Sequence, residues 1–74
     1  MFKNIIGIEG MMCPHCEAHM IEAIKKTFGA EEATASHQYK KAEFLTSVAA
    51  DEELARKTVV EAGYTFTGIT FEEV

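Results

Sequence analysis

The chain has 74 residues, a formal net charge of −5, 47% hydrophobic residues and two cysteines. This length allows a single domain over 1–74 with a thin core, which leaves no room for a deep catalytic cavity. The acidic balance argues against nucleic acid as a partner, because binding phosphates needs a basic patch. No apolar run approaches the roughly 20 residues that span a bilayer, and the amino end does not read as a signal peptide. We therefore expect a soluble, cytoplasmic protein without membrane insertion.

The first elements are a strand and a helix. Residues 2–8 are β-prone, with Ile6 and Ile8 alternating onto one face. Pro14 suits the first turn of a helix, and Gly29 is placed to end it. Between them the apolar residues recur at helical spacing: Met20, Ala23, Ile24 and Phe28.

The middle of the chain predicts two short strands joined by a turn. The segment over about 31–37 is poor in large apolar residues, so we expect it at a sheet edge, with Ala33 and Ala35 toward the core. A turn follows at 38–40. The next strand carries one face made of Ala42, Phe44 and Thr46.

A second helix and a last strand complete the chain. Asp51 is a good N-cap and Gly63 a good end for the helix. Its predicted apolar stripe consists of Leu54, Ala55, Val59 and Ala62. In the final strand over 65–73, the apolar residues change phase across Gly68, which a β-bulge would absorb: Phe66 before it, Ile69 and Phe71 after it.

The order of elements is therefore β-α-β-β-α-β. With right-handed crossovers, this order gives an α+β fold, the split βαβ or ferredoxin-like sandwich. It has a four-stranded antiparallel sheet with both helices on one face. In this fold, the loop over 9–12 and the start of the helix at Pro14 lie at the surface.

Cys13 and Cys16 lie where this loop becomes a helix. The unpaired N–H groups and the positive end of the helix dipole favour thiolate over thiol. The spacing alone leaves metal binding and disulfide chemistry open. A closed zinc site needs four ligands. One exposed pair of cysteines suits a d¹⁰ ion that accepts two sulfur ligands, and soft thiolates select Cu(I). Low coordination also admits an incoming thiolate, which favours transfer over storage.

Residues 10–16, Gly-Met-Met-Cys-Pro-His-Cys, resemble the GMxCxxC signature of heavy-metal-associated domains, found in copper chaperones and in copper-exporting ATPases. The similarity extends along the chain to Ala62-Gly63-Tyr64. It implies that Cys13 and Cys16 bind the metal, that Met11 is a buried prop for the loop, and that Tyr64 lies near the metal. It also implies a partner, either a metal-transporting P-type ATPase or another metal-binding domain. Tyrosine in this position is typical of free-standing bacterial chaperones.

The sequence departs from that family at Glu17, where an apolar residue is common. His15 and His19 are four residues apart, a spacing that lets two imidazoles share an ion. With Cys16 they make a Zn(II)-binding or buffering module an alternative. We interpret Glu17 and Glu22 as a solvated helix face. His37 reads as a strand or turn residue and nothing more, and Met12 as a cap on the loop rather than a thioether ligand.

Two other functions remain open. Cys-Pro-His-Cys also occurs in dithiol-disulfide oxidoreductases, which would make the chain an enzyme. Against this, Pro14 is the only proline, no aromatic residue precedes Cys13, and the order of elements differs, so we expect no enzyme. A sensor or buffer is the other possibility, as a monomer or as a homodimer bridged by metal.

Overall fold

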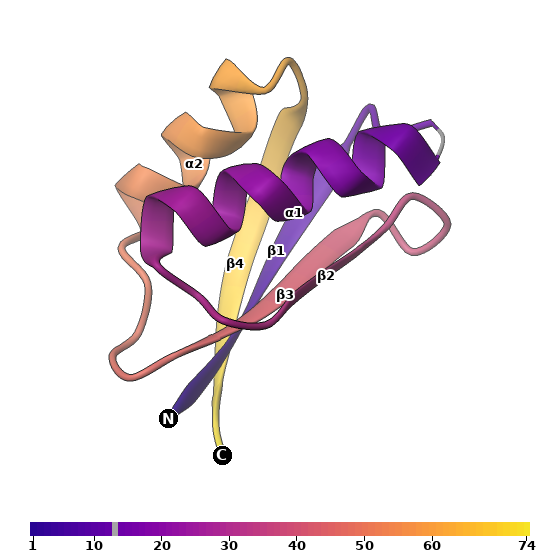
Figure 1. Ribbon diagram of the computed structural model, residues 1–74. Coiled ribbons are helices and arrows are strands. Elements are labelled where there is room, and N and C mark those ends of the chain that lie inside the picture. The colour runs from indigo at the N-terminus through magenta and orange to yellow at the C-terminus, as the bar shows by residue number, and fades with distance from the viewer. Residues whose placement is uncertain (13) are drawn as a thin grey trace.

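The computed structural model describes residues 1–12 and 14–74 (Figure 1). Cys13 lies outside the described residues. The elements in chain order are β1 (Phe2–Glu9), α1 (Pro14–Phe28), β2 (Ala33–Ser36), β3 (Lys41–Thr46), α2 (Glu52–Glu61) and β4 (Thr65–Glu73). This is the predicted βαββαβ order.

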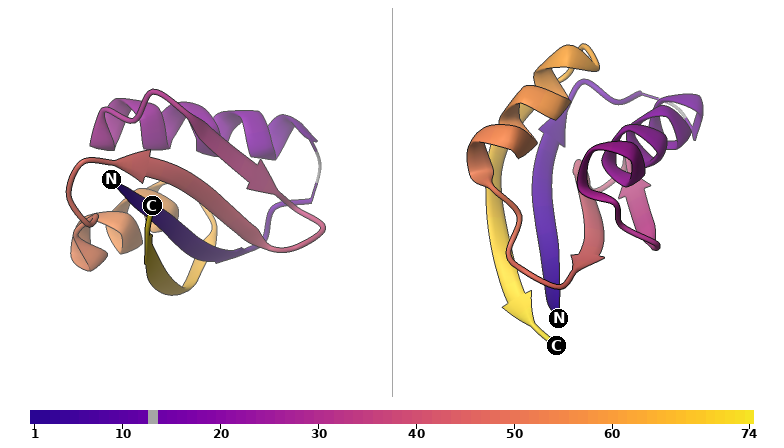
Figure 2. Two further views of the ribbon diagram at one scale, coloured as in Figure 1. Left: turned by 90° about the horizontal axis from the view of Figure 1, so that it is seen from below. Right: turned by 60° about the vertical axis from the view of Figure 1, so that its left-hand side comes forward.

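The four strands form one antiparallel sheet in the order β2-β3-β1-β4. Strand β2 is at the edge, as predicted, but it has only four residues, since His37 and the residues after it already form the turn. Helix α1 packs across β2 and β3 and helix α2 along β4, both against the same face of the sheet (Figures 1 and 2). The predicted ferredoxin-like fold class is confirmed.

A single core fills the space between the helices and the covered face. The largest fully buried side chains are Phe44, Ile6, Ile8, Met20, Ile24, Val59 and Asn4. Apart from the asparagine, these are the residues that the strand alternation and the helical stripes predict. The ring of Phe28 packs on that of Phe44 with centroids 4.9 Å apart, which anchors the last turn of α1 on β3.

Asn4 is a polar side chain in the middle of this core, and its hydrogen bonds explain why it is tolerated. Its Nδ2 donates to the Phe44 carbonyl oxygen at 3.2 Å and to Thr46 Oγ1 at 2.8 Å. Its Oδ1 accepts from the Ala50 N–H at 3.0 Å. Asn4 therefore ties β1 to β3 and to the segment that leads into α2, and it leaves no buried donor without a partner.

The predicted β-bulge lies between β1 and β4. Gly7 pairs with Gly68 but Ile8 pairs with Phe66, so Thr67 is the extra residue. A Cβ added at Gly7 would lie 2.1 Å from Thr67 Oγ1. A side chain at Gly7 would therefore force Thr67 to move its hydroxyl, which now occupies that space.

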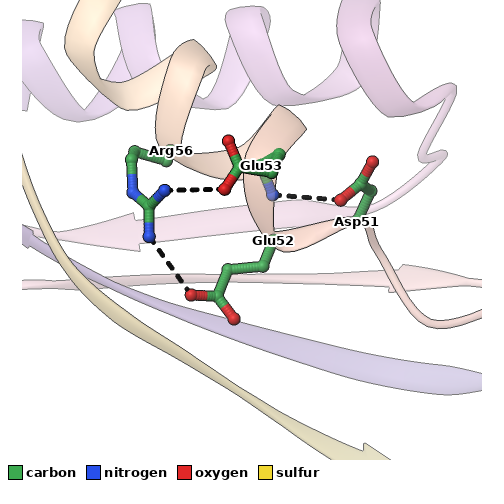
Figure 3. A network of polar contacts seen from close by, with 4 residues as sticks. All are labelled: Asp51, Glu52, Glu53 and Arg56. Carbon is green, nitrogen blue, oxygen red and sulfur yellow. Dashed lines mark hydrogen bonds and ion pairs between the residues drawn. The ribbon is translucent and has the colours of Figure 1, made fainter.

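The start of α2 is fixed by its own polar residues (Figure 3). Asp51 accepts a hydrogen bond from the Glu53 N–H at 3.0 Å and is the N-cap, as predicted. Arg56 forms ion pairs with Glu53 at 2.8 Å and with Glu52 at 3.3 Å. These pairs are exposed, so each stabilises the helix only slightly.

The prediction that Leu54 packs in the core is wrong. Leu54 is 39% exposed, at an open hollow that Phe28 and Val48 also line. The buried stripe of α2 begins one residue later, at Ala55, and includes Thr58. The Thr58 hydroxyl donates to the Leu54 carbonyl oxygen at 2.8 Å, which satisfies the polar group inside the helix and allows its burial.

The two ends of the chain lie side by side. The Val74 N–H donates to the Met1 carbonyl oxygen at 3.0 Å, which extends the pairing of β1 with β4. Both termini are at the end of the sheet opposite the β1–α1 loop (Figure 1). None of the helices in the described part of the chain is long and apolar enough to cross a membrane.

Candidate metal centre

The predicted metal-binding motif occupies the β1–α1 connection. Of its two thiols, Cys13 is outside the described residues. Cys16 lies in the first turn of α1, half-buried and packed against the core. Helix α1 begins at Pro14, as predicted, so Cys16 is at the end where main-chain N–H groups lack helical acceptors and the dipole is positive. This surrounding favours a thiolate sulfur.

Gly10, at the start of the loop, lies next to Tyr64. The φ angle of Gly10 is +106°, and a Cβ there would lie 3.4 Å from Tyr64 Cδ1. Tyr64 itself is placed by the end of α2, where Gly63 has a φ of +95°. The Gly63 N–H donates to the Val60 carbonyl at 3.0 Å and the Tyr64 N–H to the Val59 carbonyl at 3.1 Å, the Schellman pattern. The half-buried Tyr64 is therefore a neighbour of the loop.

The two methionines of the loop have opposite environments. Met11 is 6% exposed and belongs to the core, as the family resemblance implies. Met12 is 82% exposed. Met11 therefore anchors the loop on the core next to the motif, and Met12 projects from it.

His15 and His19 both lie on α1 and are exposed. The helix keeps their spacing of four residues, which places them on one side of it. Within residues 1–12 and 14–74, however, no three side chains of His, Cys, Asp or Glu gather closely enough to hold a metal ion. Cys16, His15 and His19 thus do not form a closed site among themselves, and any site that includes Cys13 is untested.

The interpretation of Glu17 as a solvated residue is wrong, and so is the reading of His37 as a turn residue without a role. Glu17 Oε2 accepts a hydrogen bond from the His37 N–H at 2.7 Å, and His37 Nδ1 lies 2.7 Å from the same oxygen. The hydrogen bonds from the backbone and then the imidazole of His37 lower the pKa of the Glu17 carboxyl. Because an ionised carboxylate only accepts, Nδ1 must carry the proton in this contact.

The β2–β3 turn, residues 37–40, also bonds to the end of β1, where it continues the β1–β3 ladder one step beyond the pair of Gly7 and Lys41. The Ile8 N–H donates to the Lys40 carbonyl oxygen at 2.8 Å, just before β1 gives way to the loop. Lys40 has a φ of +56°, a left-handed conformation that closes the turn. No motif in the sequence indicates the contacts of this turn with α1 and β1. The one signal is Glu17, the acidic residue that directly follows Cys16.

No family model matches the chain, and no curated protein matches it. Several solved structures have a similar fold. A copper binding domain from HMA7, a P-type ATPase, is 20% identical over 99% of this chain and 96% of that chain, with a TM-score of 0.75. The CopZ metallochaperone is 20% identical over 88% and 98%, also at 0.75. The yeast copper transporter domain Ccc2a, studied in apo and Cu(I)-loaded states, is 11% identical over 99% and 97%, at 0.77.

These likenesses define the class of the domain by its fold. The chain has the ferredoxin-like fold of the heavy-metal-associated domains, over nearly its whole length. The fold that the family resemblance implies is thus confirmed.

Proposed function

We propose that the chain is a metal carrier of the copper-chaperone type, which binds Cu(I) through Cys13 and Cys16. The observation that supports this most is the position of Cys16. It lies in the first turn of α1, directly after a loop whose lead-in is fixed by buried Met11 and by the contact of Gly10 with Tyr64. The fold shared with copper-binding domains is the second support.

The proposed transfer is an exchange of thiolate ligands. A d¹⁰ ion held by two sulfurs has room for a third, so an incoming thiolate bonds to the ion as one of the two cysteine sulfurs leaves it. No change of oxidation state is required. The partner is a metal-binding domain with its own thiolates, such as that of a metal-transporting P-type ATPase. The chain would act in the cytoplasm, where thiols stay reduced.

Zinc is the second candidate cargo, because exposed His15 and His19 lie beside Cys16 on α1. Imidazole nitrogen suits Zn(II), and two thiolates with one imidazole make a common partial ligand set. The oxidoreductase alternative has less support, since the structures that the chain resembles are metal-binding domains and a metallochaperone.

Anaerobic Cu(I) competition titration, paired with native mass spectrometry, tests the proposal. We expect about one Cu(I) per chain, and loss of tight binding in Cys13→Ser and in Cys16→Ser. Native mass spectrometry on the same samples separates a monomer from a homodimer bridged by metal. Unchanged Cu(I) affinity in either serine variant would contradict the proposed ligands.

The choice of metal needs a separate control. We expect His19→Gln to leave Cu(I) affinity unchanged. Tighter binding of Zn(II) than of Cu(I) after correction for buffer competition, combined with weaker Zn(II) binding in His19→Gln, would replace copper by zinc. Turnover above background in an insulin-reduction assay would instead support the oxidoreductase.

A further inference from the structure

We propose that Glu17 and the β2–β3 turn form a brace that holds the first turn of α1, and with it Cys16, in place for metal binding. Glu17 is then a positioning residue, which acts on metal retention through Cys16 without touching the metal. This inference rests on the proposed function, since it takes Cys13 and Cys16 as the ligands.

The brace joins the β2–β3 turn to the two elements that flank the loop, α1 and β1. On the side of α1, one oxygen of Glu17 receives the backbone N–H and faces Nδ1 of His37, each at 2.7 Å. On the side of β1, the Ile8 N–H donates to the Lys40 carbonyl at 2.8 Å. One four-residue turn is therefore bonded both to the residue that follows the second cysteine and to the strand that delivers the first.

The contact between Glu17 and His37 is partly covered on the side of Glu17 and exposed on the side of His37. The side chain of Glu17 is 22% exposed and that of His37 is 39% exposed. Charge-assisted hydrogen bonds are stronger than neutral ones and lose less to competing water where they are partly covered. Glu17 therefore restrains α1 more than an acid on the open face of the helix would.

The restraint acts where a helix is least stable. The N–H groups of the first turn have no acceptors inside the helix, and helix ends fray. Cys16 lies in that turn, so fraying would move its sulfur relative to the loop. Ligands held in place before binding give higher affinity and slower release, because less order has to be imposed when the ion binds.

Three variants separate a brace from a charge effect. Glu17→Ala removes the acceptor, and Glu17→Gln removes the charge but keeps an oxygen that can accept from the His37 N–H. Glu22→Ala is the matched control, because Glu22 is an exposed acid on the same helix and its loss changes the net charge equally. The readout is the rate of Cu(I) transfer, without oxygen, from each loaded protein to an excess of a chromogenic Cu(I) chelator.

We expect Glu17→Ala to release Cu(I) about three- to tenfold faster than wild type, because both contacts with His37 are lost. Glu17→Gln should stay within about twofold, and Glu22→Ala should match wild type. Amide hydrogen exchange of the metal-free protein should be faster in the second turn of α1, whose N–H groups bond to first-turn carbonyls, for Glu17→Ala alone. If Glu17→Ala does not fold, His37→Ala carries the test, with faster release expected because it loses the imidazole contact.

Two results would overturn the brace. Equal release rates in Glu17→Ala and wild type would show that the loop needs no such restraint. Equal acceleration in Glu17→Ala and Glu22→Ala would assign the effect to charge. Both differ from failure of the proposed function, in which Cys13→Ser and Cys16→Ser would still bind Cu(I) tightly.

Discussion

The adjacent methionines of the loop provide a matched pair of substitutions. Met11 is 6% exposed and packs in the core, while Met12 is 82% exposed. Met11→Ala and Met12→Ala remove the same atoms from neighbouring positions. A difference between the two variants therefore reports the environment of each side chain rather than its chemistry.

The expected cost follows from burial. Replacing a buried methionine by alanine costs about 2–5 kcal/mol, and a site at the edge of the core, where the loop can relax, falls in the lower half of that range. We expect about 2–3 kcal/mol for Met11→Ala and less than about 0.5 kcal/mol for Met12→Ala. At roughly 0.05–0.15 kcal/mol per residue, 74 residues give a total stability of about 4–11 kcal/mol. Met11→Ala thus removes a substantial part of the stability of the domain.

Urea unfolding of the reduced, metal-free proteins measures this, with the slope m expected to stay constant. A third variant, Met11→Leu, separates a prop from a thioether ligand. Leucine conserves volume, so it should restore stability to within about 1.5 kcal/mol and should restore Cu(I) affinity. It has no sulfur, so a ligand role would leave the affinity reduced.

The reasoning would be refuted if Met11→Ala changed the free energy of unfolding by less than about 0.5 kcal/mol, the size of an ordinary surface substitution. It would also be refuted if Met12→Ala, and not Met11→Ala, weakened Cu(I) binding in the competition titration.

The buried amide and the bare face of the sheet give two more predictions. Asn4→Ala should cost about 2–4 kcal/mol in urea unfolding, because it leaves the buried Ala50 N–H without its acceptor; a cost below about 1 kcal/mol would mean that water replaces the amide. Hydrogen bonds from Lys41 and Lys3 lower the pKa of Glu43, so its stabilisation is present above the unfolded pKa and is lost as pH falls through the lower folded value. Glu43→Gln should therefore lose less stability than wild type between pH 7 and acid pH in the same assay, and an identical loss would contradict this.

The parts of the fold that the sequence predicts are those with a local cause. Ile6 and Ile8 lie on the same face of β1 because a strand has a period of two. Pro14 starts α1 because it lacks an N–H, and Gly29 ends it because glycine readily adopts a positive φ. The bulge at Gly68 is visible as a change of phase among apolar residues. Each of these signals lies within a few residues of the structure it determines.

The features that the sequence does not predict are of two kinds. Some depend on contacts between residues far apart in the chain, and others on a polar residue being buried where an apolar one is expected. Glu17 and His37 are 20 residues apart and belong to types that are mostly solvated, so nothing local indicates their contact. Leu54 and Thr58 exchange the environments that hydropathy assigns to them, because an intrahelical hydrogen bond lets the threonine be buried. Asn4 is buried for the same kind of reason, since its side chain bonds to residues 40 and 46 positions away in the sequence. Among the candidate ligands in the described residues, His15, Cys16 and His19 lie on α1, as the local signals for a helix start at Pro14 predict.

The side-by-side termini have a practical consequence for experiments on a single copy of the domain. Strand β1 runs the length of the sheet between them and the loop, about 25 Å for its eight residues. A surface tether, a dye or a neighbouring domain attached at either end therefore sits at the end of the domain away from the start of α1, where Cys16 lies. Immobilised through either terminus, the molecule would present its loop outward, and copies joined end to end would each keep the loop open to a visiting partner.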